Sequence, residues 1–128
     1  MKEWGLGVIL NVYDDLVSGR KKIETRAPEP DKPEKNYESM SLDDILAFHA
    51  VDDKFKKIDE LPILKFSVSS IRKYPCIKTL LANEGIKNVL PNASSVEEAI
   101  KVYYSFPEYK ERIEKYGLVA IGLRERIL

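Results

Sequence analysis

One short segment carries most of the side chains that could do chemistry. Residues 19–26 are Gly-Arg-Lys-Lys-Ile-Glu-Thr-Arg, so four basic side chains surround a single carboxylate. An arginine can grip a phosphate or carboxylate through two parallel hydrogen bonds, whereas a lysine acts as a point charge. Arg26 and Lys21 are therefore candidate phosphate contacts, and Glu24 is the candidate group that orients both cations.

The spacing of this segment limits which of its side chains can meet. In a strand alternate residues share a face, so Glu24 lies with Arg26, while Ile23 is expected to point into the core. Lys21 joins Glu24 only if it still belongs to the turn that follows Gly19, and we expect this arrangement. The plain alternative is a solvated edge strand with a Lys–Glu ion pair.

The same residues allow a catalytic interpretation. Glu24 as general base, with Lys21 or Arg26 stabilising a pentavalent phosphate, would give ribonuclease chemistry. We expect the carboxylate to hold Lys21 protonated, because a nearby opposite charge favours the charged form, and a protonated lysine is a poor general base. In a third interpretation the basic strand is only surface and the chain is a protein-interaction module.

Few other residues are candidates. Tyr13 lies close to the segment and is the aromatic side chain expected to stack on a base. His49 has apolar neighbours and is predicted to be a satisfied core or rim histidine. With one His, one Cys and no H-x-x-x-H or C-x-x-C pattern, the sequence predicts no metal site and no cofactor.

The elements that position the segment follow from apolar periodicity and from glycine and proline. We predict a strand at 6–10, a helix at 12–18 ended by Gly19, and a strand at 22–27. A loop over 28–41 leads to a strand at 45–51. A charged connection at 54–60 precedes a long strand at 61–73, with a bulge between Phe66 and Val68.

The rest of the chain is predicted to be mainly helical. One helix spans 76–84, a second begins at Ser95 in a capping box with Glu98, and a third starts at Pro107 and runs to about 116. An apolar strand follows at 117–123. Strands at both ends with helices between them indicate an α+β domain, a small barrel that pairs distant strands and carries its helices on one side.

Composition limits the classes of function. The 128 residues fit one domain, spanning 1–128, and 44% apolar residues supply one core. Formal net charge is zero, so any contact with nucleic acid must come from a local patch. The single cysteine predicts a cytosolic (cytoplasmic) protein, and because no apolar run approaches about 18 residues we expect no membrane partner.

The pattern G-x-K-x-x-E-x-R formed by Gly19, Lys21, Glu24 and Arg26 resembles the signature of ASCH domains. The resemblance continues through 42–48, 81–86, 89–91, 95–99 and 116–121, as in small archaeal ASCH proteins. It implies a PUA-like fold, a small mixed β-barrel with a cleft for RNA or a nucleoside-like ligand. Asp43 stands where the family usually has glycine, so the turn into the next strand is expected to differ.

The resemblance also implies two activities. One bacterial branch is an amidohydrolase acting on acetylcytidine, and its motif lysine matches Lys21; its threonine nucleophile is replaced by Glu24, so the same hydrolysis is not expected. Glu84 matches a helical glutamate of that branch, and a solvated helix end is the alternative. A ribonuclease activity belongs to another branch.

The prediction is therefore an RNA- or nucleotide-binding domain. Its cleft is expected to be lined by Gly19, Lys21, Glu24, Arg26 and Tyr13. The alternative is a small hydrolase of RNA or modified nucleosides in which Lys21 and Glu24 are catalytic. Binding to RNA is expected to weaken with salt, because phosphate contacts release counterions.

Overall fold

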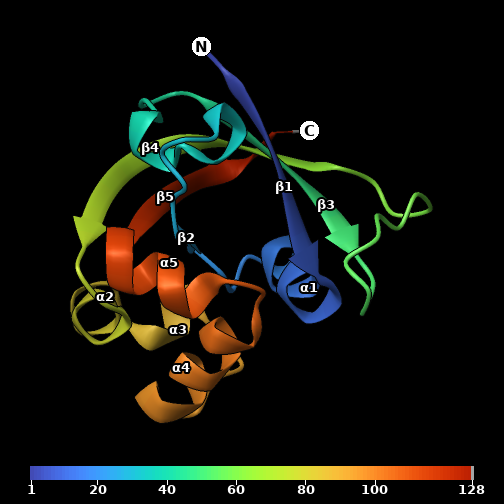
Figure 1. The fold of residues 1–128 in the computed structure, drawn as a ribbon. Coiled ribbons are helices and arrows are strands. Elements are labelled where there is room, and N and C mark those ends of the chain that lie inside the picture. Colours follow the sequence, from blue (N-terminus) through green and yellow to red (C-terminus); the bar gives the residue numbers. More distant parts are fainter. Residues whose placement is uncertain (128) are drawn as a thin grey trace.

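Five strands form one mixed sheet in the computed structural model, which describes residues 1–127. In sheet order they are β1 (Glu3–Ile9), β3 (Ile45–Val51), β4 (Leu64–Tyr74), β5 (Leu118–Ile127) and β2 (Ile23–Arg26). β1 and β3 run parallel, and the other neighbours are antiparallel. The sheet curls into a half-barrel (Figure 1), which confirms the α+β prediction and leaves β1 and β2 at its two edges.

Two strands are longer than the sequence pattern predicts, because they pair with strands that are distant in the chain. β3 has the predicted bounds, whereas β1 begins earlier, at Glu3. β5 continues to Ile127, well past the predicted end at 123, because its charged final residues pair with β4, Ile127 opposite Lys65 and Arg126 opposite Phe66. Charged side chains suit this outer stretch, since residues 124–127 are exposed to solvent on both faces of the strand.

The sheet has irregularities at two places, in the pairing of β4 with β5 and in the turn before β3. The register of β4 against β5 shifts between Phe66 and Val68, as predicted, and again between Val68 and Ser70. Asp43 has a φ of 70°, the left-handed conformation in which glycine is favoured and aspartate tolerated. Asp43 therefore occupies a left-handed turn position, of the kind in which glycine is favoured.

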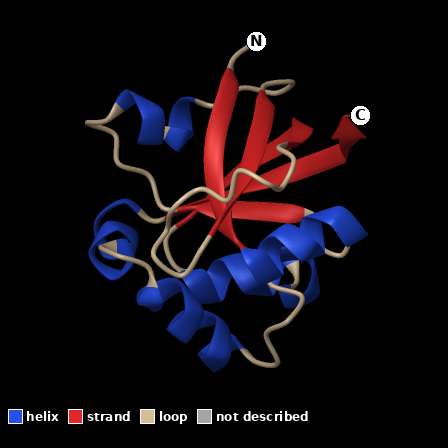
Figure 2. Ribbon diagram, turned by 90° about the vertical axis from the view of Figure 1, so that its right-hand side faces the viewer, coloured by secondary structure: helices blue, strands red, loops and turns tan. Residues whose placement is uncertain are grey.

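Helices cover the sheet in two groups. α1 (Leu10–Ser18) follows β1 directly, and α2 (Ile77–Glu84), α3 (Ile86–Val89), α4 (Val96–Ser105) and α5 (Tyr109–Tyr116) gather together on one side of the strands (Figure 2). Two 3₁₀ turns, η1 (Pro33–Lys35) and η2 (Tyr37–Ser39), lie inside the predicted loop. None of the helices in the part of the chain that the structure describes has the length and apolar character needed to cross a membrane.

The helix ends follow the sequence signals with two corrections. Gly19 ends α1 in the left-handed conformation, as predicted. The Ser95 hydroxyl accepts a hydrogen bond from the Glu98 backbone, but the Glu98 carboxylate turns back to Ser94 instead of completing the box at Ser95. α5 begins at Tyr109, not at Pro107, because Glu108 is left-handed and interrupts the helical path.

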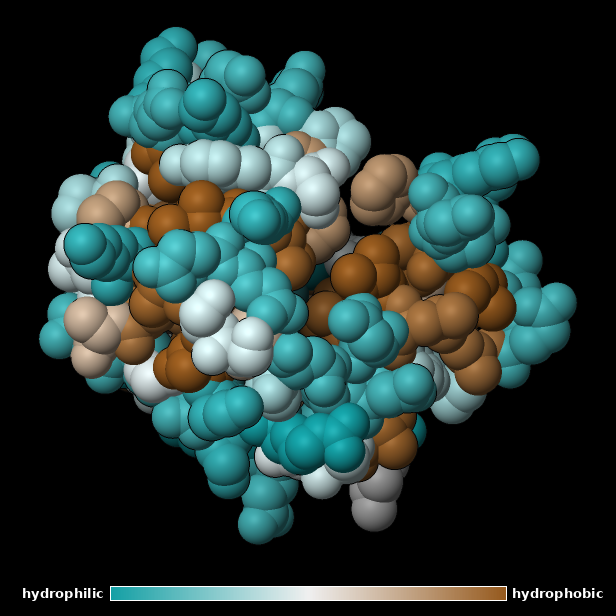
Figure 3. Space-filling view, turned by 90° about the horizontal axis from the view of Figure 1, so that it is seen from below, coloured by the Kyte–Doolittle hydropathy of each residue, from teal (hydrophilic) through white to brown (hydrophobic). Residues whose placement is uncertain are grey.

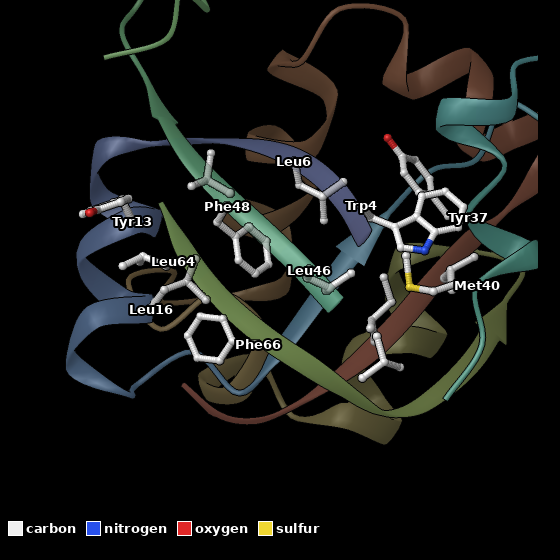
Figure 4. Packing of buried hydrophobic residues seen from close by; sticks show 14 of the residues in the cluster. Trp4, Leu6, Tyr13, Leu16, Tyr37, Met40, Leu46, Phe48, Leu64 and Phe66 are labelled. Atoms are coloured by element: carbon white, nitrogen blue, oxygen red, sulfur yellow. The ribbon is translucent and has the colours of Figure 1, made fainter. Parts of the chain in front are cut away.

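Two apolar clusters fill the two faces of the sheet. The first lies within the curl of the half-barrel and contains the aromatic and aliphatic side chains shown in Figure 4. The second lies between the sheet and α2–α5. β5 belongs to both, since Val119 and Ile121 enter the first cluster and Leu118 and Ala120 the second. This alternation fixes which face of β2, the neighbour of β5, meets the helices.

Candidate functional site

A cavity of about 300 Å³ lies where the two edge strands approach each other. We call it the seam cavity. Seen from below, the surface is hollowed between apolar and hydrophilic side chains (Figure 3). The residues that line the seam cavity come from both edge strands, the 3₁₀ turns, the β3–β4 connection and the α4–α5 region: Gly7, Val8, Ile9, Val12, Lys21, Glu24, Thr25, Arg26, Lys35, Tyr37, Val51, Phe55, Leu90, Val102, Tyr103, Phe106, Pro107, Tyr109 and Arg112.

Lys21 reaches the cavity from the turn between α1 and β2. Its backbone N–H donates to the Asp15 carbonyl of α1, and the next N–H, of Lys22, donates to the Asn88 carbonyl of α3. The Lys21 ammonium donates to the Val89 carbonyl at 2.6 Å and lies 3.4 Å from Glu24 Oε1. The predicted meeting of Lys21 with Glu24 is thus observed, and α3 supplies the carbonyl that holds the ammonium.

Glu24 joins the two cations of the motif. Its Oε1 accepts the Thr25 backbone N–H at 3.0 Å and faces Lys21, while its Oε2 accepts both Nε and Nη2 of Arg26, at 3.0 and 2.8 Å. The Lys21 and Glu24 side chains are 2% and 5% exposed, and that of Arg26 is 15% exposed. The three groups form a buried ion cluster in which Arg26 is the member most open to the cavity.

Arg26 also crosses the seam between the strands. Its Nη2 donates to the Gly7 carbonyl of β1 at 2.9 Å, although Arg26 itself lies on β2. One guanidinium therefore ties the two edges of the half-barrel and forms part of the cavity wall. Ile23 and Thr25 point the other way: Ile23 packs against the second apolar cluster, and the Thr25 hydroxyl bonds that of Tyr103.

The charges in this cluster are set by burial and by mutual attraction. Burial alone would raise the pKa of the Glu24 carboxyl, but the Arg26 and Lys21 charges and the hydrogen bonds from Arg26 and Thr25 outweigh it, so the pKa lies below its usual value. Burial opposes the charge of Arg26, yet Glu24 raises its pKa above the usual value. Both groups are ionised at neutral pH.

Lys21 is subject to opposing effects of burial and of its charged neighbours. Burial lowers the pKa of its ammonium, and Arg26 adds a like charge that also lowers it. Glu24 raises this pKa, which is the direction predicted from the sequence, but does not fully offset burial. The sequence alone does not show how completely the lysine is removed from water.

Two predicted site residues lie elsewhere. Tyr13 is buried in the first apolar cluster and its hydroxyl donates to the Pro62 carbonyl at 2.7 Å, so it does not line the seam cavity. Gly19 is the exposed end of α1 and sets the turn that delivers Lys21. Glu84 accepts hydrogen bonds from Arg72 and Tyr74 at the far end of β4, away from the cavity.

The aromatic wall of the cavity was not predicted. Tyr37 comes from η2, Tyr103 and Phe106 from α4 and its end, and Tyr109 from α5. The sequence offers no local signal for this convergence, because these residues are far apart in the chain and meet only when the helices pack. Among residues 1–127, no group of three His, Cys, Asp or Glu side chains is placed to hold a metal ion.

Two solved protein structures are similar to this chain over almost its whole length. The hypothetical protein PH0355 has 35% sequence identity and a TM-score of 0.73, covering 98% of this chain and 99% of its own. PF0455 from Pyrococcus furiosus has 31% identity and a TM-score of 0.67, covering 95% and 96%. A tyrosine-to-phenylalanine mutant of ZmASCH from Zymomonas mobilis is similar at 16% identity and a TM-score of 0.57, covering 98% of this chain and 70% of that protein. The chain belongs to one family with PH0355 and PF0455, and its fold is similar to that of ZmASCH, an ASCH-like fold.

An ASCH-like fold agrees with the observed half-barrel and its helical side. At 16% identity the likeness to ZmASCH concerns the fold alone, and a serine-to-alanine mutant of the same protein gives a similar TM-score of 0.56. No protein-family model and no curated protein matches the chain. The function of this ASCH-like domain must therefore be argued from the seam cavity itself.

Proposed function

We propose that this ASCH-like domain binds single-stranded RNA or a nucleotide-like ligand in the seam cavity. The observation that carries the proposal is that aromatic rings and basic side chains line the same cavity. Tyr37, Phe106 and Tyr109 offer ring surface, and Arg26 and Lys21 line the same cavity. Proteins that bind unpaired nucleotides use this combination, stacking a base on aromatic rings while cations meet the phosphate.

The size of the cavity supports one nucleotide rather than a duplex. A volume of about 300 Å³ is at the lower end of the range for small-molecule sites. Four basic side chains but only one carboxylate line it, which favours an anionic ligand even though the whole chain is neutral. Arg26 and Lys21 are the phosphate contacts in this proposal, and Glu24 is a positioning residue because both of its oxygens already accept hydrogen bonds or face a cation.

Titration of short single-stranded RNAs tests the proposal. We expect Arg26→Ala to weaken binding by about tenfold and Lys21→Ala by a similar factor. Lys22→Ala is the matched control, because Lys22 belongs to the same segment but is exposed and does not line the cavity. Its affinity should stay within about twofold of that of the unaltered chain, as for other exposed positions.

Salt dependence gives a second readout in the same experiment. With one phosphate contacted in a cavity of this size, the logarithm of the affinity should fall with the logarithm of salt at a slope of about −0.7 for single strands. Thermal unfolding of each variant shows whether it is folded. Affinity that ignores salt, or that survives both Arg26→Ala and Lys21→Ala in folded protein, contradicts the proposal.

Hydrolysis of RNA or of modified nucleosides is the second candidate, favoured by one observation. The pKa of Lys21 is lowered by burial, and this lysine lines the cavity. Its ammonium therefore loses its proton more easily than that of an exposed lysine, as a general base requires. Glu24 is less suited to act as base, because its pKa is lowered and its oxygens are occupied. Turnover of labelled RNA or acylated nucleosides that Glu24→Gln or Lys21→Ala abolishes supports this candidate; no turnover at high protein concentration counts against it.

A further inference from the structure

The seam cavity is lined by hydrogen-bond donors that the protein itself does not use. Tyr37 and Tyr109 both line the cavity, and among residues 1–127 neither hydroxyl has a hydrogen-bond partner. The Nη1 group of Arg26 is also free within this part of the chain, since Glu24 and the Gly7 carbonyl occupy only Nε and Nη2. Three residues with free donors, one each from β2, η2 and α5, therefore line the same cavity.

Charge adds to this concentration of donors. Lys35 lines the same cavity and forms no ion pair with any described residue, and Arg112 lines it beside the ring of Tyr109, 4.7 Å from the ring centroid. The Arg112 Nε atom is buried without a hydrogen bond and lies 3.4 Å from Glu29, its charge partner. Burial raises the pKa of Tyr37, so its hydroxyl is protonated and available as a donor at neutral pH.

The cavity offers few acceptors in return. Glu24 is the single carboxylate in the lining, and its two oxygens are engaged by Arg26, Thr25 and Lys21. The edge of a base carries both donors and acceptors, whereas a phosphate carries acceptors and negative charge. A cluster of free donors beside an excess of cations therefore suits a phosphate better than a base edge.

We propose that Arg26, Tyr37 and Tyr109 form a phosphate subsite, so that the ligand of this domain is a phosphorylated nucleoside unit and not a neutral nucleoside. The inference rests on the proposed function, and it names the part of the ligand that these residues recognise. A terminal monophosphate and an internal phosphodiester of RNA share the required chemistry. The guanidinium and the two phenols contact the phosphate oxygens, while the base lies against the remaining aromatic wall.

Calorimetric titration with matched ligands tests the subsite. The probes are the four ribonucleosides, their 5′- and 3′-monophosphates, the corresponding dinucleotides with one phosphodiester, and inorganic phosphate. We expect the best phosphorylated form to bind about tenfold or more tightly than its nucleoside, the effect of about one hydrogen bond to a charged group. Whether monophosphates or dinucleotides bind more tightly identifies the source of the phosphate.

Three tyrosine variants isolate the hydroxyl groups. Tyr37→Phe combined with Tyr109→Phe keeps both rings and the Arg26 guanidinium, and it should reduce the preference for phosphate while nucleoside affinity changes by less than about twofold. Tyr104→Phe is the matched control, since Tyr104 is an exposed tyrosine of α4 outside the cavity lining, and it should keep the full preference.

The outcomes separate the two proposals. Equal affinity for nucleosides and their phosphates overturns the phosphate subsite together with the phosphate contacts of Arg26 and Lys21, but leaves ligand binding in the seam cavity intact. A preference that is undiminished in the folded double variant overturns the subsite as assigned to Tyr37 and Tyr109 and leaves nucleotide binding intact. If no nucleoside, nucleotide, dinucleotide or short RNA binds at all, the proposed function fails and the subsite fails with it.

Discussion

Glu24 places both carboxylate oxygens against donors in a part of the molecule that is almost closed to solvent. Two cations depend on it, because Lys21 and Arg26 are themselves largely buried. A buried charge that loses its partner is strongly destabilising, even where the intact pair contributes little net stability. The motif therefore matters to folding as well as to binding, and a variant at position 24 must be interpreted with both in mind.

Glu24→Gln should lower the free energy of unfolding by about 3 kcal/mol, since it keeps the shape but leaves Lys21 and Arg26 without their counter-charge. Urea unfolding at neutral pH measures the loss. The control is Glu60→Gln, at an exposed glutamate of the β3–β4 connection, which should change stability by no more than about 0.5 kcal/mol. Equal stability of the two variants would show that the buried carboxylate is not needed to hold the two cations.

At the scale of elements, two glycines end helices with similar positive φ angles, but their ψ angles, 7° at Gly19 and −155° at Gly117, and their surroundings differ. Gly19 has a φ of +79°, and a Cβ built there meets no atom within 4 Å. Gly117, between α5 and β5, has a φ of +74°, and a Cβ there would clash with the Tyr74 carbonyl oxygen. The first position requires only an unfavourable φ, whereas the second also has no space for a side chain.

Substituting each glycine separates the two effects. Gly19→Ala should lower the free energy of unfolding by about 1 kcal/mol, the cost of the left-handed conformation. Gly117→Ala should lower it by about 3 kcal/mol or more, because strain is added to a clash with backbone that cannot easily move. Chemical denaturation of both variants provides the measurement, and the reverse order of stability would contradict the explanation.

Elements with a local signal were predicted well, and those without one were missed. The C-cap at Gly19, the strand Ile45–Val51 and the cap at Ser95 each depend on neighbours within a few residues. α3 was missed because four residues, Ile86–Val89, are too short to show helical periodicity. Yet α3 provides the Val89 carbonyl that holds Lys21, so the missed element is one that positions the site.

The candidate site shows the same division. The meeting of Lys21, Glu24 and Arg26 was predictable, because all three lie within six residues and strand alternation orders them. Tyr37 and Tyr109 were not, since each reaches the cavity through tertiary packing of a separate segment. Tyr13 was placed in the cleft for its closeness in sequence, but its position on α1 turns it into the core.

At the scale of the whole molecule, one buried carboxylate joins the start of the chain to the sheet. Asp44 accepts hydrogen bonds from the Lys2 backbone at 3.0 Å, the Trp4 indole at 3.1 Å and the Ser41 backbone at 2.9 Å. Burial opposes its charge, but these donors outweigh burial and hold the pKa of the Asp44 carboxyl below its usual value. Its unfolded pKa, about 3.9, is therefore higher than its folded pKa.

The sign of the pH dependence follows from that order. The stabilisation from Asp44 is fully present above about pH 5 and is lost as pH falls through the folded pKa, because the unfolded chain then binds more protons. Asp44→Asn should cost about 2 kcal/mol at pH 7 and show a smaller further loss between about pH 5 and pH 2 than the unaltered chain.

Urea unfolding over that pH range measures both effects of Asp44→Asn. Asp53→Asn is the control, since Asp53 is exposed in the β3–β4 connection, and it should keep the pH dependence of the unaltered chain. An Asp44→Asn curve parallel to that of the unaltered chain would show that another carboxyl group governs acid stability.

The guanidinium that spans the seam links two properties usually measured separately. Arg26 holds the Gly7 carbonyl of β1 and at the same time forms part of the cavity wall. A ligand that binds Arg26 therefore changes the free energy of separating β1 from β2. By thermodynamic reciprocity, the separation of these two strands also changes the affinity for the ligand. The rate of amide hydrogen exchange along β1 and β2 thus reports whether the seam cavity is occupied, even by a ligand whose chemical identity is unknown.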